Sequence, residues 1–239
     1  MQFCLVHGGW QGGWCWDAVA RSLRDGGHTV LAPTLRGSES GDVDRAEVNL
    51  TAIGEGLVEE IRRAGLRDVV LVGHSGGGPA IQYAADRLPD LTRRVVFVDA
   101  WVLRDGEAIH DVLPDPLPEA GRAAAAETKD GTVAMDPGLW RAHFMNGATE
   151  EQVAAVTDRL VPVPLGWLEE PISLPRFWSA GLSSSYVFLR DDKGVPPELY
   201  REMAQRLGDP RVVDCEGPHE AMLTHPEALA EALITAAKE

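Results

Sequence analysis

Short apolar runs alternate along the chain with longer stretches in which apolar residues recur every three or four positions. The apolar runs are typical of buried strands and lie at residues 3–6, 29–32, 69–72, 95–98, 186–189 and 211–213. Helical spacing occurs at residues 16–23, 53–61 and 80–88, and a last helix is expected at 226–237. This alternation predicts an α/β fold, with a mostly parallel sheet of about six strands between two layers of helices.

This alternation of strand and helix patterns is interrupted between residues 101 and 184, where proline is frequent and no convincing strand is found. Thr149 and Gln152 form a capping-box pattern that begins a helix expected at 149–160. Thr224 and Glu227 show the same pattern at the last helix. We therefore expect a core of residues 1–100 and 185–239, with a mainly helical cap of residues 101–184 inserted after a central strand.

The charge balance excludes several classes of partner. The chain has 239 residues, with 37 acidic and 22 basic side chains and a formal net charge of −15. A phosphate backbone would be repelled, so no nucleic-acid partner is expected. No apolar run approaches the roughly 20 residues that span a bilayer, and no basic leader precedes the first strand, so we expect no membrane association and a cytoplasmic location. The three cysteines, Cys4, Cys15 and Cys215, have neither disulfide nor metal-site spacing and are interpreted as buried apolar residues.

The first chemical motif is Gly73-His74-Ser75-Gly76-Gly77, which joins the apolar run at 69–72 to a helical pattern. A nucleophile elbow needs this strand-turn-helix context, with glycine two residues on either side of a serine exposed above the sheet. A glycine-rich turn with a capping serine, or a phosphate-binding loop, is the alternative. The motif lacks the Lys-Ser/Thr pair of a P-loop, which favours a nucleophilic Ser75.

A second motif, His7-Gly8-Gly9-Trp10, follows the first strand. Acyl transfer places negative charge on the former carbonyl oxygen, and preorganised backbone N–H groups stabilise that charge. One such N–H comes from the residue after the nucleophile, Gly76, and the other from the loop after an earlier strand, for which Gly9 is the candidate. A flexible turn with Trp10 packed inward is the alternative.

A serine hydroxyl needs a general base, and seven histidines compete for this role. His219 follows the last strand on a Gly-Pro turn, from which its imidazole can reach the sheet edge and Ser75. The order nucleophile, acid, histidine disfavours two rivals, while the others adjoin the serine, fall in the cap or begin the last helix. These rivals are His7, His28, His74, His110, His143 and His225.

The acid that orients the imidazole should lie on a loop just after a strand. Asp192, after the strand at 186–189, satisfies this condition. Its neighbour Asp191 and the strand-terminal Asp99 remain open as alternatives, and each could also be a solvated turn carboxylate.

With these residues placed, the chain resembles the plant methylesterase and hydroxynitrile-lyase branch of the α/β-hydrolase superfamily and its bacterial esterase relatives. The resemblance covers residues 1–100 and 185–239 and rests on HGGWQGGWCW, VLVGHSGGG, RDDKGVP and GPHEAML. It implies an α/β-hydrolase fold, no cofactor and no metal, with Ser75, Asp192 and His219 as the triad. Cyanogenic lyases of this branch typically carry threonine at the position of Gly8 and lysine at that of Glu220, so this chain departs from them and a hydrolase is favoured.

The resemblance implies cleavage of a carboxylic ester, thioester or lactone of a small lipophilic substrate through an acyl-enzyme on Ser75. A cofactor-free lyase acting by elimination or C–C cleavage is the alternative, and a hydrolase-fold ligand receptor is a third reading. Aromatic residues in the cap and at its rim supply surface for a lipophilic group. The candidates for substrate binding are Trp10, Trp101, Trp140, Phe144 and Trp167. A homodimer is the candidate assembly.

Overall fold

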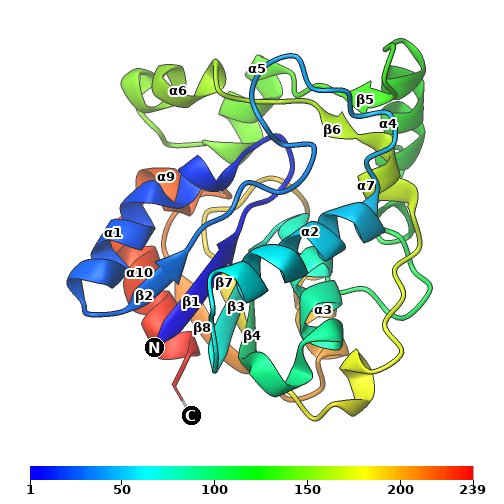
Figure 1. The fold of residues 1–239 in the computed structure, drawn as a ribbon. Helices are drawn as coiled ribbons and strands as arrows, with labels where there is room; N and C mark the ends of the chain where they lie inside the picture. The colour runs from blue at the N-terminus through cyan, green and yellow to red at the C-terminus, as the bar shows by residue number, and fades with distance from the viewer. Residues whose placement is uncertain (239) are drawn as a thin grey trace.

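The computed structural model describes residues 1–238, and its centre is a single six-stranded sheet (Figure 1). The strand order is β2-β1-β3-β4-β7-β8, and all five neighbouring pairs are parallel. The strands are β1 (Gln2–Val6), β2 (Thr29–Leu31), β3 (Val69–His74), β4 (Thr92–Val98), β7 (Ser183–Leu189) and β8 (Arg211–Cys215). The predicted α/β class and parallel sheet are confirmed.

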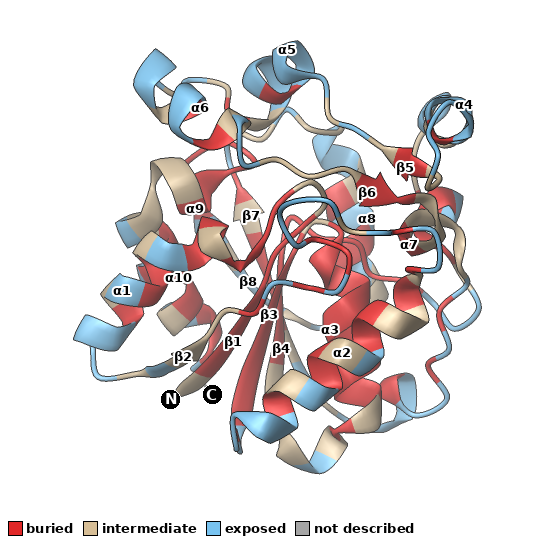
Figure 2. Ribbon diagram, turned by 45° about the horizontal axis from the view of Figure 1, so that its top comes forward, coloured by how far each residue is buried: buried red, intermediate tan, exposed pale blue. Residues whose placement is uncertain are grey.

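Helices cover both faces of the sheet and create two apolar cores. Alternation along β1 shows the division: Cys4 and Val6 pack into one core, while Phe3 and Leu5 pack into the other. The first core lies under α2 (Leu50–Arg63), α3 (Gly77–Arg87) and α8 (Pro197–Arg206). The second lies under α1 (Asp17–Asp25), α9 (Ala221–Thr224) and α10 (Pro226–Ala236). Burial follows this plan: the central strands β1, β3 and β4 are almost wholly buried, and α1 and α2 expose their outer faces (Figure 2). The three cysteines are buried and free, as predicted.

Helix α10 begins as predicted, but the capping box expected at its start is wrong. Thr224 is the last residue of α9, and its hydroxyl donates to the Glu220 carbonyl over 3.2 Å. The residue before α10 is His225, whose φ of −133° and ψ of 50° turn the chain, and Pro226 occupies the first helical position. Proline there needs no backbone donor and brings a helical φ, so the helix begins without a threonine cap.

The segment between β4 and β7 is mainly helical, and much of it lies beyond the carboxyl ends of the strands (Figure 1). Its helices are η3 (Ile109–Asp111), α4 (Leu117–Ala126), α5 (Pro137–Leu139), η4 (Trp140–Phe144), α6 (Glu150–Thr157), α7 (Leu165–Glu169) and η5 (Phe177–Ser179). Two short antiparallel strands, β5 (Thr132–Val133) and β6 (Val163–Pro164), pair within it. The capping box of Thr149 and Gln152 forms as predicted. The remaining short helices are η1 (Gly13–Trp16) and η2 (Pro89–Leu91).

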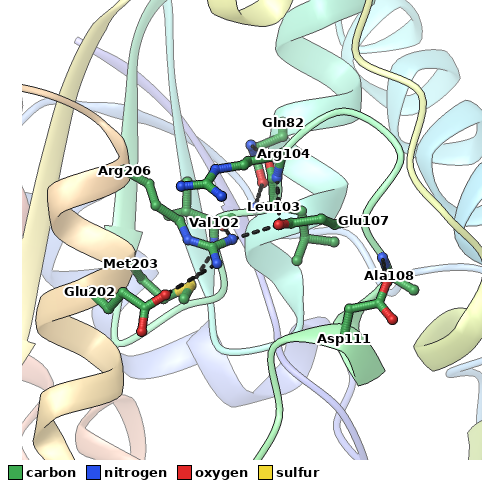
Figure 3. A network of polar contacts seen from close by, with 10 residues as sticks. All are labelled: Gln82, Val102, Leu103, Arg104, Glu107, Ala108, Asp111, Glu202, Met203 and Arg206. Atoms are coloured by element: carbon green, nitrogen blue, oxygen red, sulfur yellow. Dashed lines mark hydrogen bonds and ion pairs between the residues drawn. The ribbon is translucent and has the colours of Figure 1, made fainter.

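A polar network attaches the beginning of this segment to the core (Figure 3). The Gln82 side chain on α3 exchanges two hydrogen bonds with the Leu103 backbone, at 2.9 and 2.8 Å. From α8, Arg206 donates to the Val102 carbonyl over 2.9 Å and to Glu107 over 2.6 Å. The chain leaving β4 is therefore held between two core helices. Among the described residues, no helix has the length and apolar character that crossing a bilayer requires.

Candidate active site

Ser75 lies in the tight turn between β3 and α3 and adopts a φ of +51°. A residue with a side chain rarely adopts this left-handed conformation, so the turn is held by its surroundings. The Ser75 N–H donates to the Val98 carbonyl over 3.2 Å, and the Ser75 carbonyl accepts from Gly78 and Trp101. These bonds fix the turn against the end of β4.

The glycines that flank Ser75 are required by close backbone approach. A Cβ on Gly73 would lie 2.8 Å from the Gly77 carbonyl oxygen. A Cβ on Gly77 would lie 2.5 Å from the carbonyl oxygen of His7. Real Cβ atoms do not come so close to a carbonyl oxygen, so the predicted need for glycine at both positions agrees with the structure.

His219 and Asp192 meet although they lie on different loops. His219 follows β8, Asp192 follows β7, and His219 Nδ1 donates to Asp192 Oδ2 over 2.5 Å. Each side chain is only 3% exposed. Because Nδ1 is engaged with the carboxylate, Nε2 is the nitrogen left for a proton from a serine. The His219 ring also lies 4.4 Å from the ring of His74, which immediately precedes Ser75.

Electrostatics favour a charged form of this pair. Burial alone lowers the pKa of His219, but the charge and hydrogen bond of Asp192 outweigh it and raise that pKa above its ordinary value. Burial alone raises the pKa of Asp192, but His219 and the N–H of Gly194 outweigh it and lower that pKa. The arrangement stabilises an imidazolium, which is what a general base becomes after it takes a proton.

The two rival carboxylates have other partners. Asp191 is exposed, and its side chain accepts from the Gly217 N–H over 3.0 Å, which ties the acid loop to the histidine loop. Asp99 is 1% exposed and accepts from the Leu189 N–H over 3.0 Å. Of the three candidates, only Asp192 has a hydrogen bond to His219 within the described residues.

The remaining histidines have local partners or lie in the segment between β4 and β7. His7 is buried, its Nε2 accepts from the Leu35 N–H over 3.0 Å, and burial lowers its pKa to about 4. His74 is also buried, and burial and His219 lower its pKa well below the ordinary value, so it is neutral. The other partners follow: His28 with the N-terminus, His110 with Glu169, His143 with the Lys193 carbonyl, and His225 with Thr224.

The two amides predicted to bind an oxyanion lie close together. A Cβ on Gly76 would be 3.5 Å from the Gly9 nitrogen. Within residues 1–238, neither N–H donates a hydrogen bond to another protein atom. Two adjacent unused donors beside Ser75 are what an oxyanion hole requires, and the role of Gly9 and Gly76 stays a prediction.

The two departures from the lyase pattern have structural correlates. A Cβ on Gly8 would lie 2.9 Å from Ser75 Cβ and 3.1 Å from His74 Nδ1, so a threonine could not be accommodated without movement. Glu220 is 1% exposed, and its carboxyl accepts a hydrogen bond from the Gln11 amide. Burial raises the pKa of Glu220 to about 7, although His219 and Gln11 favour its charged form.

Three of the predicted aromatic residues lie close to His219 or Gly76. Phe144 packs edge-on against His219 with ring centres 5.0 Å apart, and Trp10 packs edge-on against Phe144 at 6.0 Å. Trp167 lies 3.6 Å from a Cβ position on Gly76.

The side chains of the other two predicted aromatic residues pack mainly against further apolar or aromatic side chains. Trp140 stacks behind Phe144 at 5.5 Å and is completely buried with Met145, Val153 and Val156. Trp101 is 6% exposed, packs on Tyr200 and reaches Ser75 through its backbone. Substrate contact by any of the five stays a prediction.

Sequence reasoning missed three polar residues near the His219–Asp192 pair. Tyr200 on α8 places its hydroxyl 3.3 Å from His219 Nδ1. Gln11 and Glu220 form a second buried polar pair, through the Gln11 amide and the Glu220 carboxyl. Gln11 and Glu220 stand inside quoted motifs and could have been suspected, whereas Tyr200 lies on an ordinary amphipathic helix with no chemical signal.

Comparisons with known proteins identify the family of this chain. The model of the alpha/beta hydrolase family matches residues 5–232. A carbendazim hydrolyzing esterase from Nocardioides sp. (strain SG-4G) is 34% identical over 243 residues, covering 97% of each chain. Methylesterase 18 of Arabidopsis thaliana is 28% identical over 179 residues, covering 68% of each.

A solved structure is similar over the whole chain. It is described as an extracellular alpha/beta-hydrolase from a Paenibacillus species with structural and functional homology to tobacco salicylic acid binding protein 2. It superposes with a TM-score of 0.94 at 30% identity and covers 100% of both chains. The expected fold and branch are confirmed, and this chain belongs to the α/β hydrolase family.

Proposed function

We propose that this protein is a serine esterase that hydrolyses small lipophilic carboxylic esters, thioesters or lactones through an acyl-enzyme on Ser75. The observation that carries the proposal is the buried His219–Asp192 pair, which lies against the residue preceding a strained serine. Similarity to an esterase that hydrolyses carbendazim and to a methylesterase supports the same reaction.

In the proposed mechanism His219 Nε2 takes the Ser75 hydroxyl proton as Ser75 Oγ attacks the ester carbonyl carbon. The Gly9 and Gly76 N–H groups stabilise the oxyanion. The imidazolium then gives its proton to the leaving alcohol as the ester C–O bond breaks. Water, deprotonated by His219, attacks the acyl-enzyme, and Ser75 regains its proton when the carboxylic acid leaves. Asp192 stays ionised throughout and holds the imidazole.

We further propose that residues 101–184 act as a cap that encloses the acyl or alcohol group. Phe144, which packs on His219, and Trp167, beside Gly76, belong to this segment and support the division. A homodimer and a cytoplasmic location remain proposals. The similar Paenibacillus hydrolase is described as extracellular, so cell fractionation of the source organism is the appropriate test of location.

Labelling and turnover test the nucleophile together. A fluorophosphonate should add to Ser75 once per chain, as located by peptide mass spectrometry, and Ser75→Ala should abolish labelling. The same variant should lower kcat on an aryl acetate by at least about 10³-fold without changing the thermal midpoint. Near-normal turnover by Ser75→Ala would overturn the assignment. A panel of methyl esters, lactones and carbendazim then defines the substrate.

The lyase alternative is disfavoured by two residues at this site. Gly8 leaves no hydroxyl beside Ser75, and Glu220 places a carboxyl where an anionic leaving group would be opposed. An acyl-enzyme mass on Ser75 after rapid mixing with an ester supports hydrolysis. Repeated turnover of a simple aryl ester also rejects a receptor without activity.

A further inference from the structure

We propose that Asp99 and Asp192 share one proton, and that the neutral Asp99 carboxyl donates the hydrogen bond that positions Asp192 behind His219. Asp99 is then a positioning residue for the proposed triad rather than a second catalytic acid. The inference rests on the proposed function only for its kinetic readout, because the protonation of Asp99 can be measured without substrate.

Asp99 is held rigidly between two central strands. It follows β4, its N–H donates to the Val187 carbonyl over 3.1 Å, and its Oδ2 accepts from the Leu189 N–H over 3.0 Å. The residue is 1% exposed and adopts a φ of +34°, a left-handed conformation that aspartate and asparagine tolerate better than most residues. Its side chain therefore has one oxygen fixed by β7 and little freedom to turn.

The other oxygen of Asp99 lacks a donor. Oδ1 is buried, and within residues 1–238 no N–H or O–H group reaches it. Asp192 lies beside it, because the Asp192 N–H donates to the carbonyl of the same Leu189 over 3.2 Å, and a hydrogen bond between the two side chains contributes to the pKa of both carboxyls. Two carboxyl groups at this distance bond only if one carries a proton, so the unpartnered Oδ1 is the natural position for that proton.

The surroundings decide which carboxyl is neutral. Asp192 accepts two hydrogen bonds, from His219 Nδ1 over 2.5 Å and from the Gly194 N–H over 2.6 Å. Asp99 receives a single amide bond, and the charge nearest to it is that of Asp192. Two buried carboxylates in contact cannot both be ionised, so Asp192, which accepts the larger number of hydrogen bonds, keeps the charge.

The other titratable groups near the pair do not supply a competing charge. Tyr186 already bonds the Ala100 backbone in both directions, at 3.0 and 2.9 Å. Burial raises the pKa of Tyr186, Tyr200 and Cys215, so all three are neutral at physiological pH. Burial and the Asp192 charge likewise raise the pKa of Asp99 well above its ordinary value.

Infrared spectroscopy tests the proton directly. At pH 9 the protein should show the carbonyl band of a neutral, slowly exchanging carboxylic acid, and the band should disappear in Asp99→Asn. The measurement is made in a Glu220→Gln background, because that second buried carboxyl is partly neutral near pH 7. A spectrum at pH 9 without an Asp99-dependent band overturns the proposal, whatever the enzyme does to esters.

Kinetics test the positioning role with isosteric variants. In Asp99→Asn the amide oxygen can accept from Leu189 and the amide nitrogen can donate to Asp192, so kcat/KM should stay within about threefold of wild type. Asp192→Asn, the matched control, should lower kcat by about 10⁴-fold because the imidazole loses its charged partner. A comparable loss in Asp99→Asn would show that Asp99 is itself ionised and would overturn the proposal.

Asp99→Leu removes the hydrogen-bond donor to Asp192. Its pH profile separates a positioning role from a purely structural one, because a loss of packing alone would not shift the pKa of His219. Without that donated bond Asp192 carries more charge toward His219, so the acid limb of the kcat/KM profile should move to higher pH. An unchanged limb in a folded Asp99→Leu enzyme contradicts the proposal. Should this variant not fold, Asp99→Asn and the infrared band still decide. Failure of Ser75 labelling would reject the proposed function without affecting the infrared result.

Discussion

At the scale of single residues, Glu220 couples the stability of the site to pH. Its carboxyl is buried one position after His219, and burial raises its pKa from 4.5 to about 7. A carboxyl whose pKa is raised on folding stabilises the folded state below its unfolded pKa, and this contribution disappears as pH rises through the folded value. The shift corresponds to about 3 kcal/mol lost between roughly pH 4.5 and pH 7.

Replacing this carboxyl should remove the pH dependence. We expect Glu220→Gln to be more stable than wild type at pH 8 and to lose that advantage below about pH 5, as measured by urea unfolding across pH. The new amide can also meet Gln11 Oε1, which is buried without a partner among the described residues. Glu216→Gln, an exposed change on the same loop, is the control and should show no such trend. Parallel stability curves for Glu220→Gln and wild type would contradict the expectation.

Ser75, His219 and Asp192 could be proposed from the sequence because each stands in a short motif with a fixed relation to a strand end. The behaviour of Asp99 and Glu220 could not, because it depends on burial and on neighbours from other loops. Sequence order alone left Asp99 open as a rival acid. Only the folded chain shows that it is buried and that its charge would be opposed by that of Asp192.

At the scale of elements, the contact between α2 and α3 depends on one glycine. A Cβ on Gly54 would lie 2.4 Å from the Tyr83 ring, so α2 can approach α3, the helix that begins at the elbow, only because the side chain is absent. Gly56 lies two residues further along the same helix, and a Cβ there would meet nothing closer than 3.9 Å.

The two glycines should therefore respond oppositely to alanine. Gly54→Ala forces the helices apart and should destabilise the fold by about 1–3 kcal/mol. Gly56→Ala removes only the flexibility of glycine from a helix and should stabilise it by about 0.5–1 kcal/mol. Chemical unfolding of both variants measures the difference. Equal effects would mean that the gap between α2 and α3 is not set by Gly54.

Element prediction succeeded where periodicity and local chemistry agreed. The strands follow apolar runs, and the Thr149–Gln152 capping box begins α6 as expected. The matching pattern at Thr224 failed because the chain forms an extra turn, α9, before the last helix. Tertiary contacts of Met222 in the second core favour that turn, and no local pattern reveals them.

At the scale of the whole molecule, core and cap segment are joined around the site. The Trp10 indole donates to the Val133 carbonyl over 2.9 Å, and the Trp10 carbonyl accepts from the Val161 N–H over 3.0 Å. The loop that contains Gly9 is therefore hydrogen-bonded to β5 and to the residues just before β6. The sequence indicated that residues 101–184 form an insertion but not how it packs, because its contacts run between irregular turns rather than along a periodic face.

The net charge of −15 surrounds this site with a negative field that acts on substrates before they bind. At about 10 mM salt the screening length is about 30 Å and the whole surface contributes, whereas at 150 mM it falls to about 8 Å. An ester with an anionic acyl group should therefore gain about two- to tenfold in kcat/KM between these conditions, while a neutral ester of the same shape should change little. Initial rates for 4-nitrophenyl hemisuccinate and 4-nitrophenyl butyrate, with sodium chloride as the only variable, provide the comparison. Equal salt responses for the two esters would show that the field at the entrance is local and that the distant acidic residues do not influence which substrates reach Ser75.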